Sequence, residues 1–304
     1  MAWYYILLLA ILSLSLFILL LYFILPYILV HYLSYPRRYD NETALSVDKK
    51  KGLLPDVDQM ERIKVEFQMP DGYIIHGDIT RNNLKKFVIF AHGYTWTREG
   101  QLKYAQIYQR LGYSIVLYDE RSHGENIHND VTMGYKEAED LHCIIRFIYE
   151  KYGADIQLGI MGESMGGATV LQVLKYHDPL EFVHADCPYS SLRELFSYKL
   201  KTMYMPQFLL KPIDHIIKRK HGYHIDDVNP EKYVKESDIP LLLTTGHEDD
   251  FVPFIQCQHL YDAKEKGYKE LHFFEGARHA KSLEKHPQKY EEVVKSFLRK
   301  IAQI

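Results

Sequence analysis

The sequence predicts an α/β protein, a mostly parallel sheet flanked by helices, preceded by one transmembrane helix. Strand-like and helix-like segments alternate along most of the chain, as they do in proteins built from βαβ units. A short apolar run at 156–161 passes through a glycine-rich turn into an amphipathic segment at 165–176. The first thirty-six residues contain no Asp, Glu, Lys or Arg. These observations separate an apolar N-terminal segment from a domain of alternating elements.

The N-terminal segment has the length of a membrane span. Trp3 to Leu25 is nearly unbroken apolar sequence of about 23 residues, which at about 1.5 Å per residue crosses the hydrocarbon core of a bilayer. One alternative, a cleaved signal peptide, has basic residues ahead of a shorter apolar core, and the other, a buried core helix, has polar residues on one face. The sequence therefore predicts a retained single-pass anchor in the lipid bilayer. Arg37 and Arg38 follow it directly, so the positive-inside tendency places the domain in the cytoplasm.

Three parts follow from this division: a transmembrane anchor at 1–36, a polar linker at 37–60 and one α/β domain at 61–304. The domain is expected to open with a hairpin formed by 63–69 and 73–79, because Pro70-Asp71-Gly72 separates the two runs. Further strands are expected near 87–91, 114–118, 156–161, 182–185, 241–245 and 271–274. Helices are expected near 98–111, 134–152, 165–176, 256–266 and 287–302.

The glycine-rich turn contains the candidate nucleophile. Gly162-Glu163-Ser164-Met165-Gly166 matches the G-x-S-x-G nucleophile elbow, with a strand before it and a helix after it. Such a turn exposes the serine hydroxyl above the sheet, and the helix N-terminus beneath favours developing negative charge. Glycine is needed on both sides because side chains there would collide with the neighbouring strand and helix. By itself the pattern also fits an ordinary glycine-rich turn.

A nucleophilic serine needs a base and an acid that orients the base. In a strand–turn–helix architecture these follow the serine in the order acid, then histidine. Acidic residues come directly after the strand at 241–245, and a histidine lies on the loop after the strand at 271–274. The candidate catalytic residues in this order are Ser164, Asp249 and His279.

At this point the chain resembles the α/β-hydrolase superfamily, in its serine esterase and serine aminopeptidase-like branch, over about residues 61 to 302. The pattern G-x-x-D-x-x-V-P of that family matches Gly246–Pro253 and selects Asp249, while Glu248 and Asp250 remain alternatives. The late G-x-x-H of the family matches Gly276–His279. The resemblance implies an α/β-hydrolase fold with a Ser-His-Asp triad.

Two further matches concern loops. The pair His92-Gly93 stands where family members form the oxyanion hole, so the resemblance implies backbone N–H donors at Tyr94 and Met165 and a structural role for His92. The stretch Asp119 to Gly124 resembles the D-x-R-G-x-G loop, with Ser122 in place of a usual glycine. We expect Asp119 and Arg121 to fix that loop.

In this superfamily the irregular interval at about 190–238 holds a cap over the pocket. Its apolar residues either line an acyl-binding cavity or form the core of the cap itself: Leu195, Phe196, Leu200, Met203, Tyr204, Met205, Phe208, Leu209 and Leu210. The cap also contains His215, His221 and His224. Because no nearby cysteine or carboxylate completes a convincing ligand set, we expect surface histidines rather than a metal site.

The expected activity is serine-dependent hydrolysis of a carboxylic ester, with a small-molecule ester or short acyl compound as substrate. An acyl-enzyme would form, without a metal or an organic cofactor. A serine aminopeptidase or a thioesterase is the enzymatic alternative, and a non-catalytic membrane-tethered binding module is the alternative from another class. The net charge of −3 provides no basic surface for nucleic acid, and three scattered cysteines form no disulfide framework.

Overall fold

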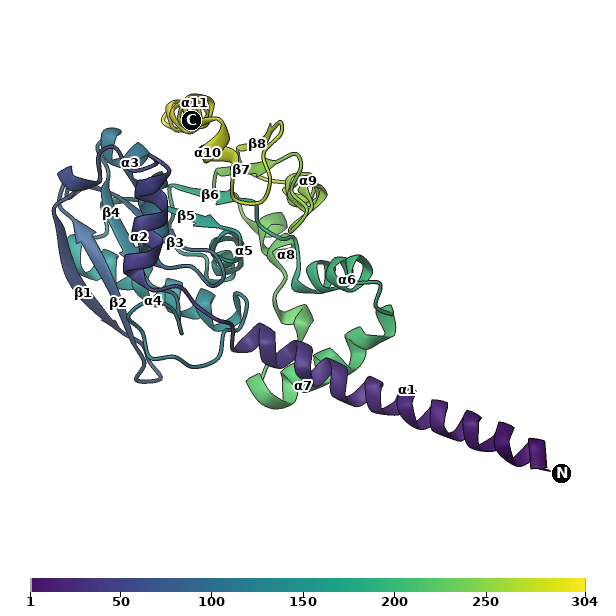
Figure 1. Cartoon of the computed structure of the whole chain (residues 1–304). Helices are drawn as coiled ribbons and strands as arrows, with labels where there is room; N and C mark the ends of the chain where they lie inside the picture. The colour runs from purple at the N-terminus through teal and green to yellow at the C-terminus, as the bar shows by residue number, and fades with distance from the viewer. Residues whose placement is uncertain (1, 304) are drawn as a thin grey trace.

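The computed structural model describes residues 2–303, and its centre is one eight-stranded sheet with helices on both faces (Figure 1). The strands are β1 (Arg62–Gln68), β2 (Ile74–Thr80), β3 (Lys86–Ala91), β4 (Ser114–Tyr118), β5 (Gln157–Glu163), β6 (Phe182–Asp186), β7 (Leu241–Gly246) and β8 (Lys269–Phe274). Their spatial order is β1-β2-β4-β3-β5-β6-β7-β8. The β1–β2 and β2–β4 pairs are antiparallel and the other pairs are parallel. The predicted hairpin and mostly parallel sheet are confirmed.

Helices connect the strands and extend the chain at both ends. They are α1 (Ala2–Ser34), α2 (Asn41–Lys50), α3 (Leu102–Arg110), α4 (Tyr135–Tyr152), α5 (Met165–Gln172), α6 (Leu192–Thr202), α7 (Leu210–His221), α8 (Pro230–Glu236), α9 (Phe254–Ala263), α10 (Ser282–Lys285) and α11 (Pro287–Ile301). Short 3₁₀ turns are η1 (Val57–Gln59), η2 (Arg98–Gln101), η3 (Val173–Tyr176), η4 (Gln207–Leu209) and η5 (Ile225–Asp227). The helices expected within the α/β domain are therefore confirmed within a few residues.

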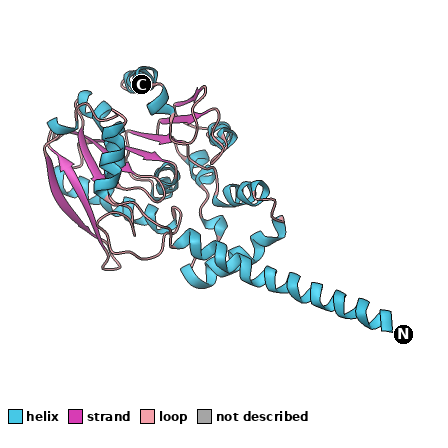
Figure 2. Ribbon diagram, viewed as in Figure 1, coloured by secondary structure: helices cyan, strands magenta, loops and turns pink. Residues whose placement is uncertain are grey.

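The sheet separates two apolar layers, and β3 shows how one strand supplies both. Phe87 and Ile89 face the layer formed with α4, α5, α8 and α9, whereas Val88 and Phe90 face the layer formed with α3 and α11. This alternation follows from the two-residue period of a strand. A sheet covered on both sides by helices, as Figure 2 shows, holds the carboxyl ends of its parallel strands at one edge. The functional residues come from that edge.

The segment predicted as a linker, 37–60, contains a helix that packs on the domain. The Asp40 carboxylate caps α2 by accepting a hydrogen bond from the backbone N–H of Thr43 at 2.7 Å. Ala44 and Asp48 on this helix are buried. Residues 37–60 therefore form part of the folded surface, with α2 lying across the domain in Figure 1.

The interval predicted as a cap contains α6, α7 and α8, and the apolar side chains of α6 and α7 belong to a third cluster apart from the two sheet layers. Helix α1 extends away from the sheet and passes α7 (Figure 1). By length and composition α1 is able to cross a bilayer, and no residue in its most apolar stretch is buried in the protein. Val30, near its C-terminal end, does join the cap cluster.

Candidate active site

Ser164 occupies the turn between β5 and α5 in a conformation that non-glycine residues rarely adopt. Its φ is 57° and its ψ is −113°. Close packing of the backbone around Gly162 and Gly166 maintains this strained conformation of Ser164. A Cβ at Gly162 would lie 2.1 Å from the carbonyl oxygen of Gly166, and a Cβ at Gly166 would lie 2.2 Å from that of Ala91. Only glycine fits at either position, so the local sequence forces the serine outward.

Ser164, His279 and Asp249 form one continuous chain of hydrogen bonds. His279 Nε2 lies 2.8 Å from Ser164 Oγ, and His279 Nδ1 lies 2.7 Å from Asp249 Oδ2. The other oxygen of Asp249 accepts hydrogen bonds from the backbone N–H groups of Phe251 at 2.9 Å and Val252 at 2.8 Å. These donors fix the carboxylate in the orientation that the histidine requires.

The two acids left open beside Asp249 lie elsewhere. Asp250 forms an ion pair with Arg278 on the surface, and Glu248 is exposed. The structure therefore brings Asp249, and neither of its neighbours, to His279.

Tyr94 and Met165, the predicted oxyanion-hole residues, both line the small cavity that contains Ser164. Met165 is the first residue of α5, so its N–H has no partner within the helix. Tyr94 follows β3 on the loop that begins with His92 and Gly93. Their placement is compatible with two N–H donors beside the serine.

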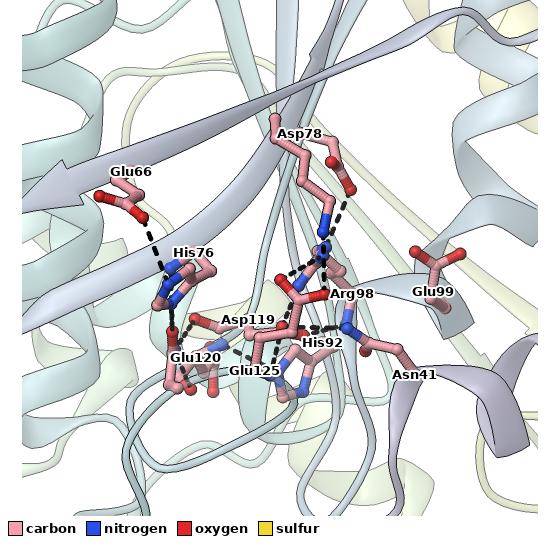
Figure 3. A network of polar contacts seen from close by, with 12 residues as sticks. Asn41, Glu66, His76, Asp78, His92, Arg98, Glu99, Asp119, Glu120 and Glu125 are labelled. Carbon is pink, nitrogen blue, oxygen red and sulfur yellow. Dashed lines mark hydrogen bonds and ion pairs between the residues drawn. The ribbon is translucent and has the colours of Figure 1, made fainter.

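A buried polar network supports the loop that carries Tyr94 (Figure 3). His92 accepts a hydrogen bond from the backbone N–H of Glu120 at 2.9 Å, and burial lowers the pKa of its imidazole. The Arg98 guanidinium lies between Asp78 and Asp119. Asp119 also accepts from the backbone N–H of Arg98 at 2.9 Å. These contacts agree with the loop-supporting roles expected for His92 and Asp119.

Arg121 and Ser122 hold the adjoining loop. The Arg121 guanidinium donates to both oxygens of Asp140, at 2.8 and 2.6 Å. Ser122, at the position where glycine is usual, has a φ of 70°. Its hydroxyl donates to the carbonyl of Asp130 at 3.0 Å, which anchors a turn that glycine would leave flexible.

Ser164 lies between two cavities of opposite character. One is a largely apolar cavity of about 70 Å³, whose walls include Met133, Leu195, Phe196 and Val252. The other is a larger cavity of about 190 Å³ whose walls include charged side chains: Asp48, Lys51, Lys103, Glu163 and Lys281. Ser164 therefore has largely apolar walls on one side and charged walls on the other.

A buried ion pair lies directly beneath the serine. Burial by itself raises the pKa of Glu163, but the Lys103 ammonium 2.6 Å away and a hydrogen bond from Tyr104 hold that pKa below its ordinary value. Glu163 is therefore charged and locally neutralised by Lys103. Neutralisation matters because an unpaired carboxylate next to Ser164 would oppose the negative charge that develops during acyl transfer.

Two parts of the wall come from outside the predicted domain 61–304. Leu33 of α1 lines the apolar cavity, and Asp48 and Lys51, in and just after α2, line the polar one. The Tyr94 hydroxyl donates to the backbone carbonyl of Leu33 at 2.8 Å, which ties the oxyanion loop to the end of α1. Sequence reasoning missed these residues because uniform apolarity in α1 and uniform polarity around α2 hide the few positions that face the protein.

A second serine–histidine–aspartate chain joins α1 to the cap, and it corrects one expectation. His221 was expected on the surface with His215 and His224, but it is buried. Its Nε2 lies 3.0 Å from Ser34 Oγ and its Nδ1 lies 2.8 Å from Asp130 Oδ2. The prediction was wrong because the neighbours that bury His221 come from α1 and from the loop before α4. His215 and His224 are exposed, as expected.

Residues 102–303 match the prolyl oligopeptidase family. The chain is 29% identical over 275 residues to YqkD of Bacillus subtilis (strain 168), an uncharacterized protein, covering 88% of this chain and 90% of that one. The esterase PF2001 of Pyrococcus furiosus has a TM-score of 0.67 at 24% identity, covering 81% of this chain and 93% of its own. The acylaminoacyl peptidase of Pyrococcus horikoshii has a TM-score of 0.60 at 20% identity, covering 79% of this chain and 41% of its own.

The fold likeness and the family match agree. The esterase and the peptidase, at these identities, share the α/β-hydrolase fold with this chain, which confirms the predicted fold class. The family match covers well over half of the sequence and includes the elbow and both remaining triad positions. The chain belongs to the prolyl oligopeptidase family and is an α/β hydrolase of the esterase and peptidase type.

Proposed function

We propose that this protein is a membrane-anchored serine hydrolase that cleaves carboxylic esters through an acyl-enzyme. The hydrogen-bonded chain Ser164–His279–Asp249, which opens into a cavity on the serine side, is the observation that supports the proposal most directly. The apolar cavity suits the acyl group and the polar cavity suits an alcohol leaving group.

In the proposed mechanism, His279 Nε2 takes the proton from Ser164 Oγ as that oxygen attacks the ester carbonyl. The oxyanion accepts hydrogen bonds from the N–H groups of Tyr94 and Met165. Asp249 holds the imidazole in the required orientation and stabilises its charged form. The protonated His279 then gives its proton to the alkoxide as the C–O bond breaks. Water, deprotonated by the same histidine, releases the carboxylic acid and restores the serine.

Labelling with a fluorophosphonate probe tests whether Ser164 is a nucleophile. We expect the full chain to be labelled and Ser164→Ala to remain unlabelled. Ser34→Ala is the matched control because Ser34 also lies beside a histidine. The Ser34→Ala variant should still be labelled. Absence of labelling in the folded native protein would support the non-catalytic binding module instead.

Peptidase activity is the second candidate function. The position of the Asp48 carboxylate is the observation that favours it. This carboxylate lines the polar cavity and one of its oxygens is buried without a partner among the described residues. Burial raises its pKa, which weakens it as an anchor for the charged amine of a peptide. A comparison of p-nitrophenyl esters with aminoacyl-naphthylamides separates the two activities, and cleavage of amides alone would overturn the ester proposal.

For the membrane, we propose that α1 is a retained single-pass anchor with the hydrolase domain in the cytoplasm. The full chain should stay in membranes through carbonate washing because its attachment is apolar burial rather than screened charge. Protease added to intact cells should leave the domain whole. Digestion without permeabilisation would reverse the orientation, and a soluble chain beginning after the apolar run would show a cleaved signal.

A further inference from the structure

Helix α1 has two unlike halves. From Trp3 to Leu21 its side chains are exposed, and at about 1.5 Å per residue this stretch is about 28 Å long, close to the hydrocarbon thickness of a bilayer. After Leu21, buried and half-buried side chains recur every three or four residues along one face: Tyr22, Leu25, Pro26, Leu29, Val30, Leu33 and Ser34. The first half is free of the protein and the second half packs on the cap.

A groove runs between the packed half of α1 and the cap. Leu29, Val30 and Leu33 form one wall. The opposite wall includes Phe196, Leu200, Met203 and Ile213 from α6, its C-terminal end and α7. The cavity has a volume of about 130 Å³, and within residues 2–303 Lys199 is the one charged residue that lines it.

This groove adjoins the apolar cavity that contains Ser164. Leu33, Phe196 and Lys199 line both spaces, so the two share a wall on each side. Apolar walls therefore extend from the groove beside α1 to the cavity that contains the candidate nucleophile. The α1 wall of the groove begins at Leu29, eight residues after the free half of α1 ends at Leu21.

An exposed aromatic side chain of the cap lies beside the end of the free half of α1. Phe208, which is exposed, packs against Tyr22 of α1 with ring centroids 6.0 Å apart. Tyr204, in the loop after α6, is 98% exposed, and nothing in the described part of the chain covers it. The Lys220 ammonium lies 3.8 Å from the ring centroid of Tyr27. Aromatic rings and lysines together are typical of side chains at a membrane surface.

We propose that this groove is an acyl channel through which a long-chain ester from the bilayer reaches Ser164. The channel is defined by Leu29, Leu33, Phe196, Leu200, Met203 and Ile213, and the proposal rests on the ester hydrolase function above. A chain that passes from lipid into this channel moves from one apolar surrounding to another, so the hydrophobic penalty of its transfer is small. The ester carbonyl stops at the serine, with its polar alcohol in the charged cavity.

The test uses the full chain in phosphatidylcholine vesicles with p-nitrophenyl butyrate and p-nitrophenyl palmitate. Leu29→Trp and Met203→Trp fill the channel from opposite walls at a distance from the triad. We expect kcat/KM for palmitate to fall about tenfold or more in both variants, while butyrate stays within about twofold. Leu20→Trp is the matched control because Leu20 lies in the free half of α1, and it should change neither rate.

A second arm tests the bilayer as the source of the substrate. Palmitate ester placed in the same vesicles as the enzyme should be cleaved faster than ester placed in separate vesicles. Equal rates from the two placements would overturn delivery from the bilayer.

Other outcomes separate this proposal from the function on which it rests. Unchanged palmitate cleavage in both tryptophan variants, or an equal loss with both esters, would overturn the acyl channel. A native enzyme that cleaves butyrate but not palmitate would also overturn it, and ester hydrolysis would stand. Failure to cleave either ester, together with absent fluorophosphonate labelling, would instead overturn the hydrolase function.

Discussion

Two chains of hydrogen bonds in this molecule join a serine, a histidine and an aspartate with nearly the same distances. Ser164–His279–Asp249 spans 2.8 and 2.7 Å, and Ser34–His221–Asp130 spans 3.0 and 2.8 Å. Their surroundings differ. The His279 side chain is 20% exposed, whereas that of His221 is 2% exposed. Relay geometry alone therefore does not distinguish a candidate triad from a structural link.

The two serines also differ in the helix end at which each one lies. Ser164 precedes the N-terminus of α5, where backbone N–H groups point at developing negative charge. Ser34 is the last residue of α1, where the exposed backbone groups are carbonyls and the partial charge is negative. An oxyanion at Ser34 would meet repulsion instead of donors. The backbone N–H of Val131 also donates to the Ser34 carbonyl at 2.9 Å, so this chain ties α1 to the domain.

Replacing each histidine should produce the largest contrast. His279→Ala should lower kcat/KM for an ester by a factor on the order of 10⁴–10⁶, because the serine loses its base. His221→Ala should stay within about tenfold of the native rate because it removes no group at the reacting bond. Steady-state kinetics with a short ester measures both. A comparable loss in His221→Ala would mean that the second chain takes part in the chemistry.

The two aspartates at the end of β7 should differ nearly as much. Asp249→Asn should lower kcat by a factor on the order of 10³–10⁴, because an amide cannot hold the imidazole in the required tautomer. Asp250→Asn should be mild because the ion pair of Asp250 with Arg278 is exposed. Burst and steady-state kinetics of the two variants identify which aspartate orients His279. The reverse ranking would identify Asp250 instead of Asp249.

For stability, we expect the two histidine substitutions to rank in the opposite order from their effects on activity. His221→Ala removes the hydrogen-bond partner of the buried Ser34 hydroxyl and of Asp130 Oδ2, which should lower the free energy of unfolding by about 1–3 kcal/mol. His279→Ala should cost less because the His279 side chain is partly exposed and lines the polar cavity, so water can take its place beside Asp249. Thermal unfolding of the detergent-solubilised full chain gives both values. A smaller loss for His221→Ala than for His279→Ala would contradict the structural role.

The smallest expected effect is the pH dependence of the stability that Asp130 contributes. The hydrogen bond from His221 holds the pKa of Asp130 below its ordinary value of about 4. A lowered pKa in the folded state contributes stability above the unfolded pKa, and that contribution disappears as pH falls through the folded value. Asp130→Asn should therefore be less stable than the native chain at pH 7, and the difference should shrink below about pH 4. A difference that is constant from pH 3 to 7 would show that the Asp130 charge is unimportant.

Short local patterns allowed much of the fold and the candidate triad to be predicted. The G-x-S-x-G turn depends on neighbours within a few residues, and the close approach of Gly166 to Ala91 explains why that pattern admits few alternatives. The candidate acid, Asp249, comes shortly after β7. The apolar run of β7 by itself predicts a strand there. Such features need little information from the rest of the chain.

The parts that were missed are contacts between distant segments. Ser34 and His221 are 187 positions apart, and nothing near either residue indicates the other. The burial of Asp48 on α2 is hidden for the same reason, because a polar helix shows no apolar stripe when only a few of its side chains face the protein.

By itself the sequence determined the α/β class, the nucleophile elbow, the order of the candidate triad and an apolar segment of membrane length, because each depends on local spacing or composition. Only the tertiary structure decided that the end of α1 and the polar helix α2 form walls of the candidate active site, and that one of two similar relays faces a cavity. Those features depend on which surfaces meet after folding, and side-chain packing between remote segments leaves no pattern in either segment alone.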